Sequence, residues 1–462
     1  MSANKSPETG QRKRLLLDVT IAATTDLNTG IQRVVRNIAQ LAESTTAEEE
    51  YDCQPFVCHG GQLSSVGFDG RSKWDERCFR WIAKTWMGMH RAFAKFLSGI
   101  RQNAGDKYLS FLSRLRKLFV PKTLVRWFTN TYRKWTGRAI ELQEDDVLIL
   151  LDASWDLPLQ EILATARAKR IPVVTVVYDL IPVLHPQFHQ EQLKAVFAEW
   201  LNLVLQYSDM MIGISQTVRD DVREFSRSIP DANPDCVFES FRLGSDFEPS
   251  KKIAAESTRF PEALDDKASF YLAVGTIEPR KNHPFLLDAF EQLWENNSKA
   301  NLVIVGKKGW MCEETIQRIQ QHPQLNQKLF HIADADDNEL AYLYRRAKAL
   351  LFPSIVEGFG LPIVEAFQLG TPVLASNTRI HREVAGDNAT FFELDSPAQL
   401  VQQIEQIESG ERKLQKPEAQ IDSWANSCSE FFDKIERFLR SYESETMPES
   451  PSPIRIDSRE VA

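Results

Sequence analysis

Apolar positions in the first half of the chain form short runs, separated by longer stretches in which apolar and polar positions recur with a helical period. Residues 15–19 make one such run, which suits a strand buried in a parallel sheet. The polar residues 20–30 predict a loop, and residues 31–41 have the period of an amphipathic helix. The same patterns predict strands at residues 146–151, 172–178 and 210–214, and helices at residues 190–207 and 216–225.

A second series of strands and helices follows a polar, charged segment at residues 239–267, which contains Gly244, Pro249 and Pro261. A final helix is predicted at residues 423–442, because its apolar residues share one face. Those residues are Trp424, Phe431, Ile435 and Leu439. The strands predicted in this second half, with a helix between each pair, are residues 270–274, 302–305, 329–332, 349–352, 372–375 and 390–392.

Strands that alternate with helices predict an α/β protein with two doubly wound, Rossmann-like domains. We place the N-terminal domain at residues 13–240, a linker at 241–268 and the C-terminal domain at 269–422. The helix at 423–442 is expected to cross back, and residues 443–462, rich in Pro, Ser and charge, are expected to be disordered. Such sheets bind ligands at the carboxyl ends of their strands, so the cleft between two of them locates a site without naming its chemistry.

Residues 71–138 interrupt the strand and helix pattern with a basic, tryptophan-rich insert. It holds 17 Lys and Arg against 3 Asp and Glu, and five of the ten Trp. Its helical spacing favours basic amphipathic helices, which suit an anionic membrane surface. A cap on its own domain and a dimer interface are the alternatives, so an oligomer stays open, and the sequence shows no nucleic-acid motif.

The composition is that of a globular protein, with 43% hydrophobic and 26% charged residues and a formal net charge of −9. The polar residues 1–13 predict no targeting segment, and no run of 18 apolar residues exists to span a bilayer. The six cysteines are scattered without a C-x-x-C pair, which favours reduced thiols. We therefore expect a cytoplasmic protein, peripheral to the inner face of the cytoplasmic membrane if the insert binds lipid.

The strongest chemical signal lies in residues 352–366, where a strand is followed by a glycine-containing loop and a helix. Gly358 and Gly360 allow the backbone to approach a ligand closely. Pro362 suits the first turn of a helix, whose free N–H groups and positive potential suit a diphosphate. Glu357 lies in the loop and Glu365 about one turn into the helix. Both glutamates can face the cleft, but their spacing does not assign a task to either.

This segment resembles the E-x7-E motif of the family-four retaining glycosyltransferases, which have the GT-B fold. Residues 274–282 resemble the strand and loop that hold the donor diphosphate in that family, and residues 336–354 resemble its approach to the glutamate motif. The resemblance is close from Phe270 to about Leu400, and looser at residues 29–33 and 178–182.

By matching positions, the resemblance implies that Arg280 and Lys281 neutralise the donor diphosphate. It implies that Glu357 supports positive charge near the anomeric carbon of the donor, and that Glu365 hydrogen-bonds the ribose. Many members carry Arg where this chain has Thr276, so Arg280 or Arg33 is left to supply the second cation. The further donor-binding positions that the resemblance implies are Gly30, Gly275, Gly358, Phe359, Gly360 and Leu361.

Candidate acceptor residues are Asp179 and His185, which follow a predicted strand end in the N-terminal half. Asp179 can orient an acceptor hydroxyl or cap the next turn, and His185 can contact acceptor or pack beside Pro186. Residues 334–337 contain a D-x-D pattern typical of metal sites, but Asp336 or Asp337 is the better candidate for capping the helix that follows. We therefore expect no metal and no cofactor other than the nucleotide-sugar substrate.

The resemblance implies retaining transfer of a hexose from a nucleotide sugar to a growing glycan. Residues 29–33 resemble bacterial surface-polysaccharide mannosyltransferases and rhamnosyltransferases, which favours a GDP-linked, mannose-type donor over a UDP-linked hexose. A catalytically inactive scaffold tethered by the basic insert and a sugar-phosphate epimerase of the same fold are the alternatives. The presence of Glu357, Arg280 and Lys281 favours the enzyme.

Overall fold

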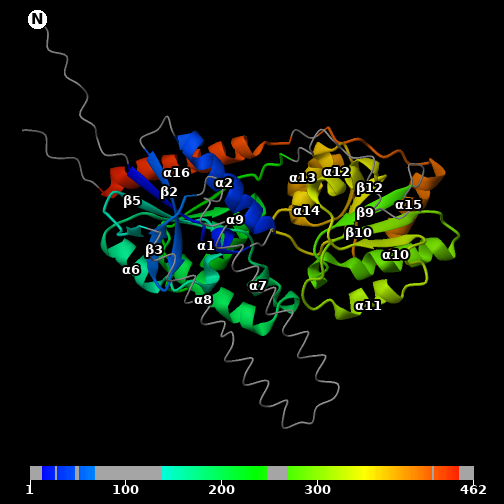
Figure 1. Ribbon diagram of the computed structural model, residues 1–462, viewed down its shortest axis with the longest axis horizontal. Helices are drawn as coiled ribbons and strands as arrows, with labels where there is room; N and C mark the ends of the chain where they lie inside the picture. Colours follow the sequence, from blue (N-terminus) through cyan, green and yellow to red (C-terminus); the bar gives the residue numbers. More distant parts are fainter. Residues whose placement is uncertain are drawn as a thin grey trace, which may run out of the picture.

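The computed structural model describes residues 13–25, 29–46, 51–67, 138–246, 269–418 and 421–446. The basic insert lies outside these residues except for Arg138, so the prediction made for it is not tested here. The same holds for the tail beyond residue 446. Figure 1 shows the described elements as two α/β halves, one around each sheet.

The N-terminal half is built on an eight-stranded sheet. Strands β2, β1, β5, β6, β7 and β8 lie side by side in that order and run parallel. Strands β3 and β4 pair antiparallel at the edge beside β2. In order across the sheet the strands are β4 (Ala139–Ile140), β3 (Gln62–Ser65), β2 (Tyr51–His59), β1 (Lys13–Asp18), β5 (Asp146–Leu150), β6 (Val173–Val177), β7 (Met210–Gly213) and β8 (Val237–Ser240). The helices of this half are α1 (Thr20–Thr24), α2 (Gly30–Thr46), α6 (Gln160–Ala168), α7 (Ile181–Leu184), α8 (Glu191–Tyr207) and α9 (Gln216–Ser226), with short 3-10 turns η2 (Ser154–Asp156) and η3 (Pro186–Phe188).

The predictions for this half were incomplete, and the short edge strands β3 and β4 were among the elements not predicted. Residues 20–30 were predicted as a loop, but α1 occupies their first five residues. Strand β2 was missed because only its last part is buried, and polar residues and Pro55 precede that part. Strand β8 was not predicted, and its last two residues fall within the segment 239–267 that was predicted as polar. Its first residue, Val237, is exposed and Glu239 is charged, so the strand has no continuous apolar run.

The C-terminal half contains a six-stranded parallel sheet, and all six predicted strands are present. Its helices are α10 (His283–Glu295), α11 (Glu313–Gln321), α12 (Asp337–Arg346), α13 (Leu361–Gln368), α14 (Arg379–Ala385) and α15 (Ala398–Ser409), with 3-10 turns η5 (Pro279–Lys281) and η6 (Gly386–Asn388). In order across the sheet the strands are β11 (Leu329–Ile332), β10 (Asn301–Val305), β9 (Phe270–Val274), β12 (Ala349–Phe352), β13 (Val373–Ser376) and β14 (Ala389–Phe392).

This strand order is that of a doubly wound nucleotide-binding fold. The chain starts at β9 in the middle, adds β10 and β11 on one side, and then crosses to β12, β13 and β14 on the other. In such sheets the crevice between the two strands where the direction reverses is the usual ligand site. The loops after β9 and β12 therefore lie at the expected position, and these are the loops that carry Arg280 and Glu357.

The last helix, α16 (Trp424–Thr446), packs against α2 of the N-terminal half (Figure 1). Its predicted apolar face is buried, and Cys428 contacts the carbonyl of Ile38. The helix ends four residues beyond the predicted residue 442, so residues 443–446 belong to it and not to the tail. The chain thus passes from the C-terminal half back over the N-terminal one, which joins the two halves a second time.

Two buried carboxyl groups lie at the carboxyl ends of β1 and β5, where the N-terminal sheet reverses direction. Asp18 accepts hydrogen bonds from the backbone N–H and hydroxyl of Thr20, and Asp152 accepts one from the backbone N–H of Ala22. Burial and the neighbouring charge of Asp152 raise the pKa of Asp18 to about 7. These two carboxyl groups hold the start of α1, and Asp18 binds its proton more tightly in the folded protein than in the unfolded chain.

An Asp18→Asn variant is expected to weaken the pH dependence of stability. Because the folded-state pKa is raised, the group destabilises the fold increasingly as pH rises from its ordinary value of 3.8 to about 7, and by a constant amount above that. A shift of this size corresponds to about 4 kcal/mol between about pH 4 and pH 8. Urea unfolding at several pH values measures the difference. Asp145→Asn, at an exposed carboxylate, is the control; equal slopes in Asp18→Asn and wild type would contradict the expectation.

Candidate functional site

The two loops at the reversal point of the C-terminal sheet contact each other directly. The loop after β9 ends in η5, which carries Arg280 and Lys281, and Asn282 closes that turn in the left-handed conformation. The backbone N–H of Ile355, in the loop after β12, donates to the carbonyl of Arg280 over 2.8 Å. The loops are therefore held as one unit, and their charged side chains are brought together.

Glu357 bridges the two cations. Its carboxylate accepts from Arg280 Nη1 and from Lys281 Nζ, each over 2.5 Å, and only 8% of the residue is exposed. Burial by itself raises the pKa of Glu357, but the charges of Arg280 and Lys281 outweigh it and lower that pKa to about 2. Glu278, also buried, forms an ion pair with Arg280 Nη2 at 2.6 Å. Glu357 is thus held ionised beside two fixed positive charges.

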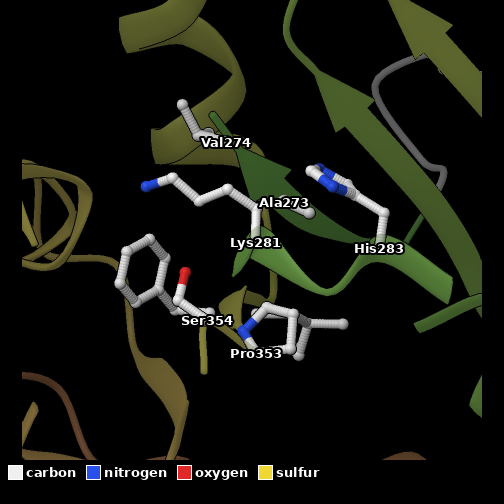
Figure 2. A pocket seen from close by; sticks show the side chains of 8 residues that line it. Ala273, Val274, Lys281, His283, Pro353 and Ser354 are labelled. Carbon is white, nitrogen blue, oxygen red and sulfur yellow. The ribbon is translucent and has the colours of Figure 1, made fainter. Parts of the chain in front are cut away.

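Lys281 extends along the carboxyl edge of the sheet. Figure 2 shows its side chain running past Val274, with Ser354 on the same side and His283 turned away. Its ammonium group lies 5.1 Å from the centre of the Phe352 ring. The small cavity beside it measures about 10 Å³, room for about one water molecule. A larger ligand must therefore contact Lys281 from the open side of the two loops.

Gly358 brings the loop after β12 against the N-terminal half. A Cβ at this position would lie 2.0 Å from the carbonyl oxygen of Tyr178, at the end of β6. The hydroxyl of Ser215 donates to the Gly358 carbonyl over 2.9 Å. Gly360 has a φ of +109°, which glycine adopts without strain, and α13 begins at the next residue. Of the two glycines predicted for close approach, Gly358 thus contacts the N-terminal half, whereas Gly360 lies against Phe352 and Ile363 of its own half.

Glu365 lies on α13 and is buried, with 2% of its surface exposed. It accepts from Arg33 Nη1 over 2.5 Å and from the Tyr344 hydroxyl over 2.9 Å. Arg33 belongs to α2 of the N-terminal half, and the first residue of that helix, Gly30, approaches Leu361. The structure therefore places the beginnings of α2 and α13 next to each other.

The two candidate acceptor residues have different surroundings. Asp179 accepts from the backbone N–H of Ile181 over 3.0 Å, which is the capping interaction considered for it. Burial raises the pKa of Asp179, and the nearby charge of Arg280 opposes that shift. Asp179 is therefore close to the charged cluster. His185 instead stacks on Phe188, with ring centres 6.2 Å apart.

Trp310 makes a contact between the domains that the sequence did not indicate. Its indole Nε1–H donates to the carbonyl of Phe188 over 2.8 Å, and its ring stacks on His189 at 5.5 Å. Burial, then the charges of Arg280 and Lys194, lower the pKa of His189 to about 4, so its ring is neutral at neutral pH. The loop that carries Trp310 is fixed by Gly309, whose N–H donates to Ile277.

Thr276, which stands where many family members carry Arg, packs against Gly309. A Cβ on Gly309 would lie 2.8 Å from Thr276 Cγ2, so the threonine packs under this loop. In the sequence, only the glycine at position 309, shortly after the end of β10, indicates that this loop lies close to Thr276.

Trp310→Phe is expected to lower the free energy of unfolding by about 1 kcal/mol, because it keeps an aromatic ring against His189 but leaves the Phe188 carbonyl without its donor. Urea unfolding measures the change. Met311→Ala, at the adjacent exposed residue, serves as the control. Equal stability of Trp310→Phe and wild type would show that the hydrogen bond contributes nothing.

The D-x-D pattern has the structural role expected for it. Asp336 caps α12 by accepting from the backbone N–H of Glu339, and the Glu339 side chain accepts from the backbone N–H of Asp336. Across the part of the chain that the structure describes, no group of three or more His, Cys, Asp and Glu side chains is arranged to hold a metal ion. Within the same residues, no helix is both long and apolar enough to cross a bilayer.

Comparison with known proteins shows which family this site resembles. Residues 254–423 match the family model described as glycosyl transferases group 1, a stretch that includes both loops and Glu365. Over these residues the resemblance found in the sequence is confirmed.

Curated relatives extend the similarity into the N-terminal half. The chain is 35% identical over 274 residues to the serotype-specific mannosyltransferase WbdA of Escherichia coli, covering 57% of this chain and 33% of WbdA. Another WbdA is 29% identical over 406 residues, covering 85% of this chain and 42% of WbdA. The O-antigen chain mannosyltransferase RfbU of Salmonella typhimurium is 26% identical over 273 residues, covering 58% of this chain and 69% of RfbU. The chain thus spans less than half the length of the WbdA proteins it matches.

Solved structures show the same two-domain architecture. HepE of Anabaena, crystallised with UDP and glucose, has a TM-score of 0.50 at 13% identity and covers 94% of this chain and 99% of its own. Sucrose-phosphate synthase from Thermosynechococcus elongatus has a TM-score of 0.50 at 15% identity, covering 94% and 96%. At these identities the likeness shows the fold, and the predicted GT-B fold is confirmed.

Proposed function

We propose that this chain is a retaining glycosyltransferase that moves a hexose from a nucleotide-sugar donor to a growing glycan of a bacterial surface polysaccharide. The observation that carries the proposal is the arrangement of Arg280, Lys281 and Glu357 on two joined loops at the reversal point of a nucleotide-binding sheet. The match of these loops to the glycosyl transferases group 1 model supports it.

Arg280 and Lys281 suit the departure of a nucleoside diphosphate. The leaving diphosphate gains negative charge in the transition state, and fixed cations in a partly buried site stabilise that charge without reorganising. Arg280 contacts Val356 and Glu357 through Nη1 and Glu278 through Nη2, and Lys281 Nζ contacts Glu357. A guanidinium carries five N–H donors and an ammonium three. Both side chains therefore keep donors for phosphate oxygens while they hold Glu357.

Glu357 is positioned to act on the sugar. Its carboxylate is ionised over the whole physiological range, since its pKa is held at about 2, and it lies between the diphosphate-binding cations and the N-terminal half. A fixed negative charge there supports positive charge on the anomeric carbon as the bond to phosphate breaks. Attack by the acceptor on the same face, with the leaving phosphate taking the proton of the hydroxyl, gives retention.

We further propose that transfer needs no metal ion and that the preferred donor is a GDP-linked, mannose-type sugar. Two protein cations already supply the charge that a divalent ion supplies elsewhere. The names of WbdA and RfbU, both mannosyltransferases, support mannose, whereas the HepE crystals contain UDP. A UDP-linked hexose is the alternative donor.

The acceptor is proposed to bind on the side of the N-terminal half, beside Asp179. That carboxyl group lies near Arg280, and Gly358 packs against the backbone that precedes it, so an acceptor hydroxyl there faces the anomeric carbon. The binding of residues 71–138 to an anionic membrane surface remains a proposal made from the sequence alone.

A thermal-shift screen against nucleotide sugars in the presence of EDTA tests this function. A donor at about 100 times its Kd stabilises the fold by about 2.7 kcal/mol. We expect GDP-mannose to raise the Tm most. If neither GDP-linked nor UDP-linked sugars raise it, the proposed function is wrong. Binding without any transfer to a mannose-terminated oligosaccharide would favour the alternative of an inactive scaffold.

A further inference from the structure

Glu365 is the one of the two motif glutamates whose partners come from both domains. The Tyr344 hydroxyl reaches it from α12 of its own half, and Arg33 reaches it from α2 of the other half. Each oxygen of the carboxylate accepts one of these bonds, because Arg33 contacts Oε1 and Tyr344 contacts Oε2. The orientation of the carboxylate is therefore set by two side chains 311 residues apart in the chain (344 − 33).

The remaining capacity of Glu365 fits a sugar diol. A carboxylate has about four lone-pair directions. The side chains of the residues that the structure describes use two of them, one from Arg33 and one from Tyr344. One direction on each oxygen remains, which suits two neighbouring hydroxyl groups such as those of a ribose. A carboxylate with 2% exposure also needs a cation nearby, since burying its charge unpaired is unfavourable. Arg33 supplies that cation, at 2.5 Å, with 30% of its side chain exposed.

Arg33 is held in place by the approach of the two helices. Its backbone N–H donates to the carbonyl of Thr29, and the Cβ position of Gly30 is 3.8 Å from Leu361 Cδ1. If the domains moved apart, the Arg33 guanidinium would leave Glu365, and of these two partners Glu365 would keep only Tyr344. The pair therefore exists only when the domains are together.

We propose that Arg33 is a positioning residue of the donor site, which orients and neutralises Glu365 from the opposite domain so that Glu365 can bind the ribose of the donor. This inference rests on the proposed function. It makes recognition of the nucleoside part of the donor depend on closure of the two domains, and by linkage nucleoside binding favours closure to the same extent. Arg280 and Lys281, which belong to a single domain, hold the diphosphate independently of closure.

Isothermal titration of UDP, GDP and inorganic pyrophosphate into Arg33→Met and wild type tests this assignment. Arg33→Met is expected to weaken binding of the nucleoside diphosphates about tenfold or more, equivalent to about 1.4 kcal/mol, while pyrophosphate binding stays within about twofold. Arg33→Lys is expected to recover part of the loss, because it restores the charge without the planar fork. In an Arg33→Met/Glu365→Gln double variant, the loss is expected to be no larger than in Glu365→Gln alone.

The matched control is Arg379→Met. Arg379, on α14, forms an ion pair with Asp221 on α9, so this pair also joins the two domains but lies at an exposed position. Nucleotide binding by this variant is expected to equal that of wild type. Equal nucleotide affinity of Arg33→Met and wild type would overturn the inference. So would an equal loss for pyrophosphate, which would make Arg33 a phosphate contact.

The proposed function fails in a different way from the inference. If wild type binds neither UDP nor GDP, there is no donor site for Arg33 to support. If wild type binds a nucleotide and Arg33→Met binds it equally well, the donor site stands and the role of Arg33 is refuted.

Discussion

A Glu357→Gln variant is expected to lose about 10²–10³-fold in kcat while binding a nucleoside diphosphate as tightly as wild type or more tightly. The amide keeps the shape of the side chain but removes the negative charge proposed to support the anomeric carbon. It also removes the negative charge that Arg280 and Lys281 each contact over 2.5 Å. Both cations are therefore more available to phosphate oxygens. Steady-state kinetics together with calorimetric titration of UDP and GDP separate the two effects.

Lys281→Met provides the comparison for Glu357→Gln. It removes a cation that binds the diphosphate, so nucleotide affinity and kcat are expected to fall together. Thermal unfolding of both variants checks that the fold is kept. Sugar transfer by Glu357→Gln at the wild-type rate would refute the role assigned to this glutamate.

Gly358→Ala is expected to reduce transfer by more than about 10²-fold by preventing the domains from closing. The added Cβ would lie 2.0 Å from the Tyr178 carbonyl oxygen and 3.2 Å from Asp179 Cβ, so backbone of the two domains must move apart. The added Cβ meets the chain just beyond β6 and does not touch the strands of either sheet. Small-angle scattering is therefore expected to show a larger radius of gyration in a protein that remains folded.

Gly67→Ala is the control for this substitution, because a Cβ at Gly67 meets no atom of the described residues within 4 Å. Its activity and radius of gyration are expected to match wild type. A Gly358→Ala variant that is compact and active would mean that the contact with Tyr178 is not needed for catalysis.

The sequence predicts most of the C-terminal half because the inner strands of its sheet are buried on both faces. Such strands read as continuous apolar runs, as at Phe270–Val274 and Asn301–Val305, and all six were located. The edge of the N-terminal sheet is different. Only the last part of β2 is buried, and β8 carries exposed Val237, so neither gives a continuous run.

The charged centre of the site was foreseeable because its residues lie in two short loops with glycine, proline and charge in a recognisable order. Partners that meet only through the arrangement of the domains were not. Glu365 was expected to hydrogen-bond the donor ribose, but nothing in the local sequence indicates that Arg33 and Tyr344 contact it. The stacking of His189 on Trp310 likewise depends on how the two sheets face each other.

We propose that the loops bearing Arg280, Lys281 and Glu357 catalyse metal-independent transfer from a nucleotide sugar with retention. The most direct test is NMR of the product formed from GDP-mannose and a mannose-terminated oligosaccharide in the presence of EDTA, with UDP-glucose as a second donor. We expect release of the nucleoside diphosphate and a new linkage with the α configuration of the donor. A β-linked product, or no release from either donor until a divalent metal is added, would contradict it.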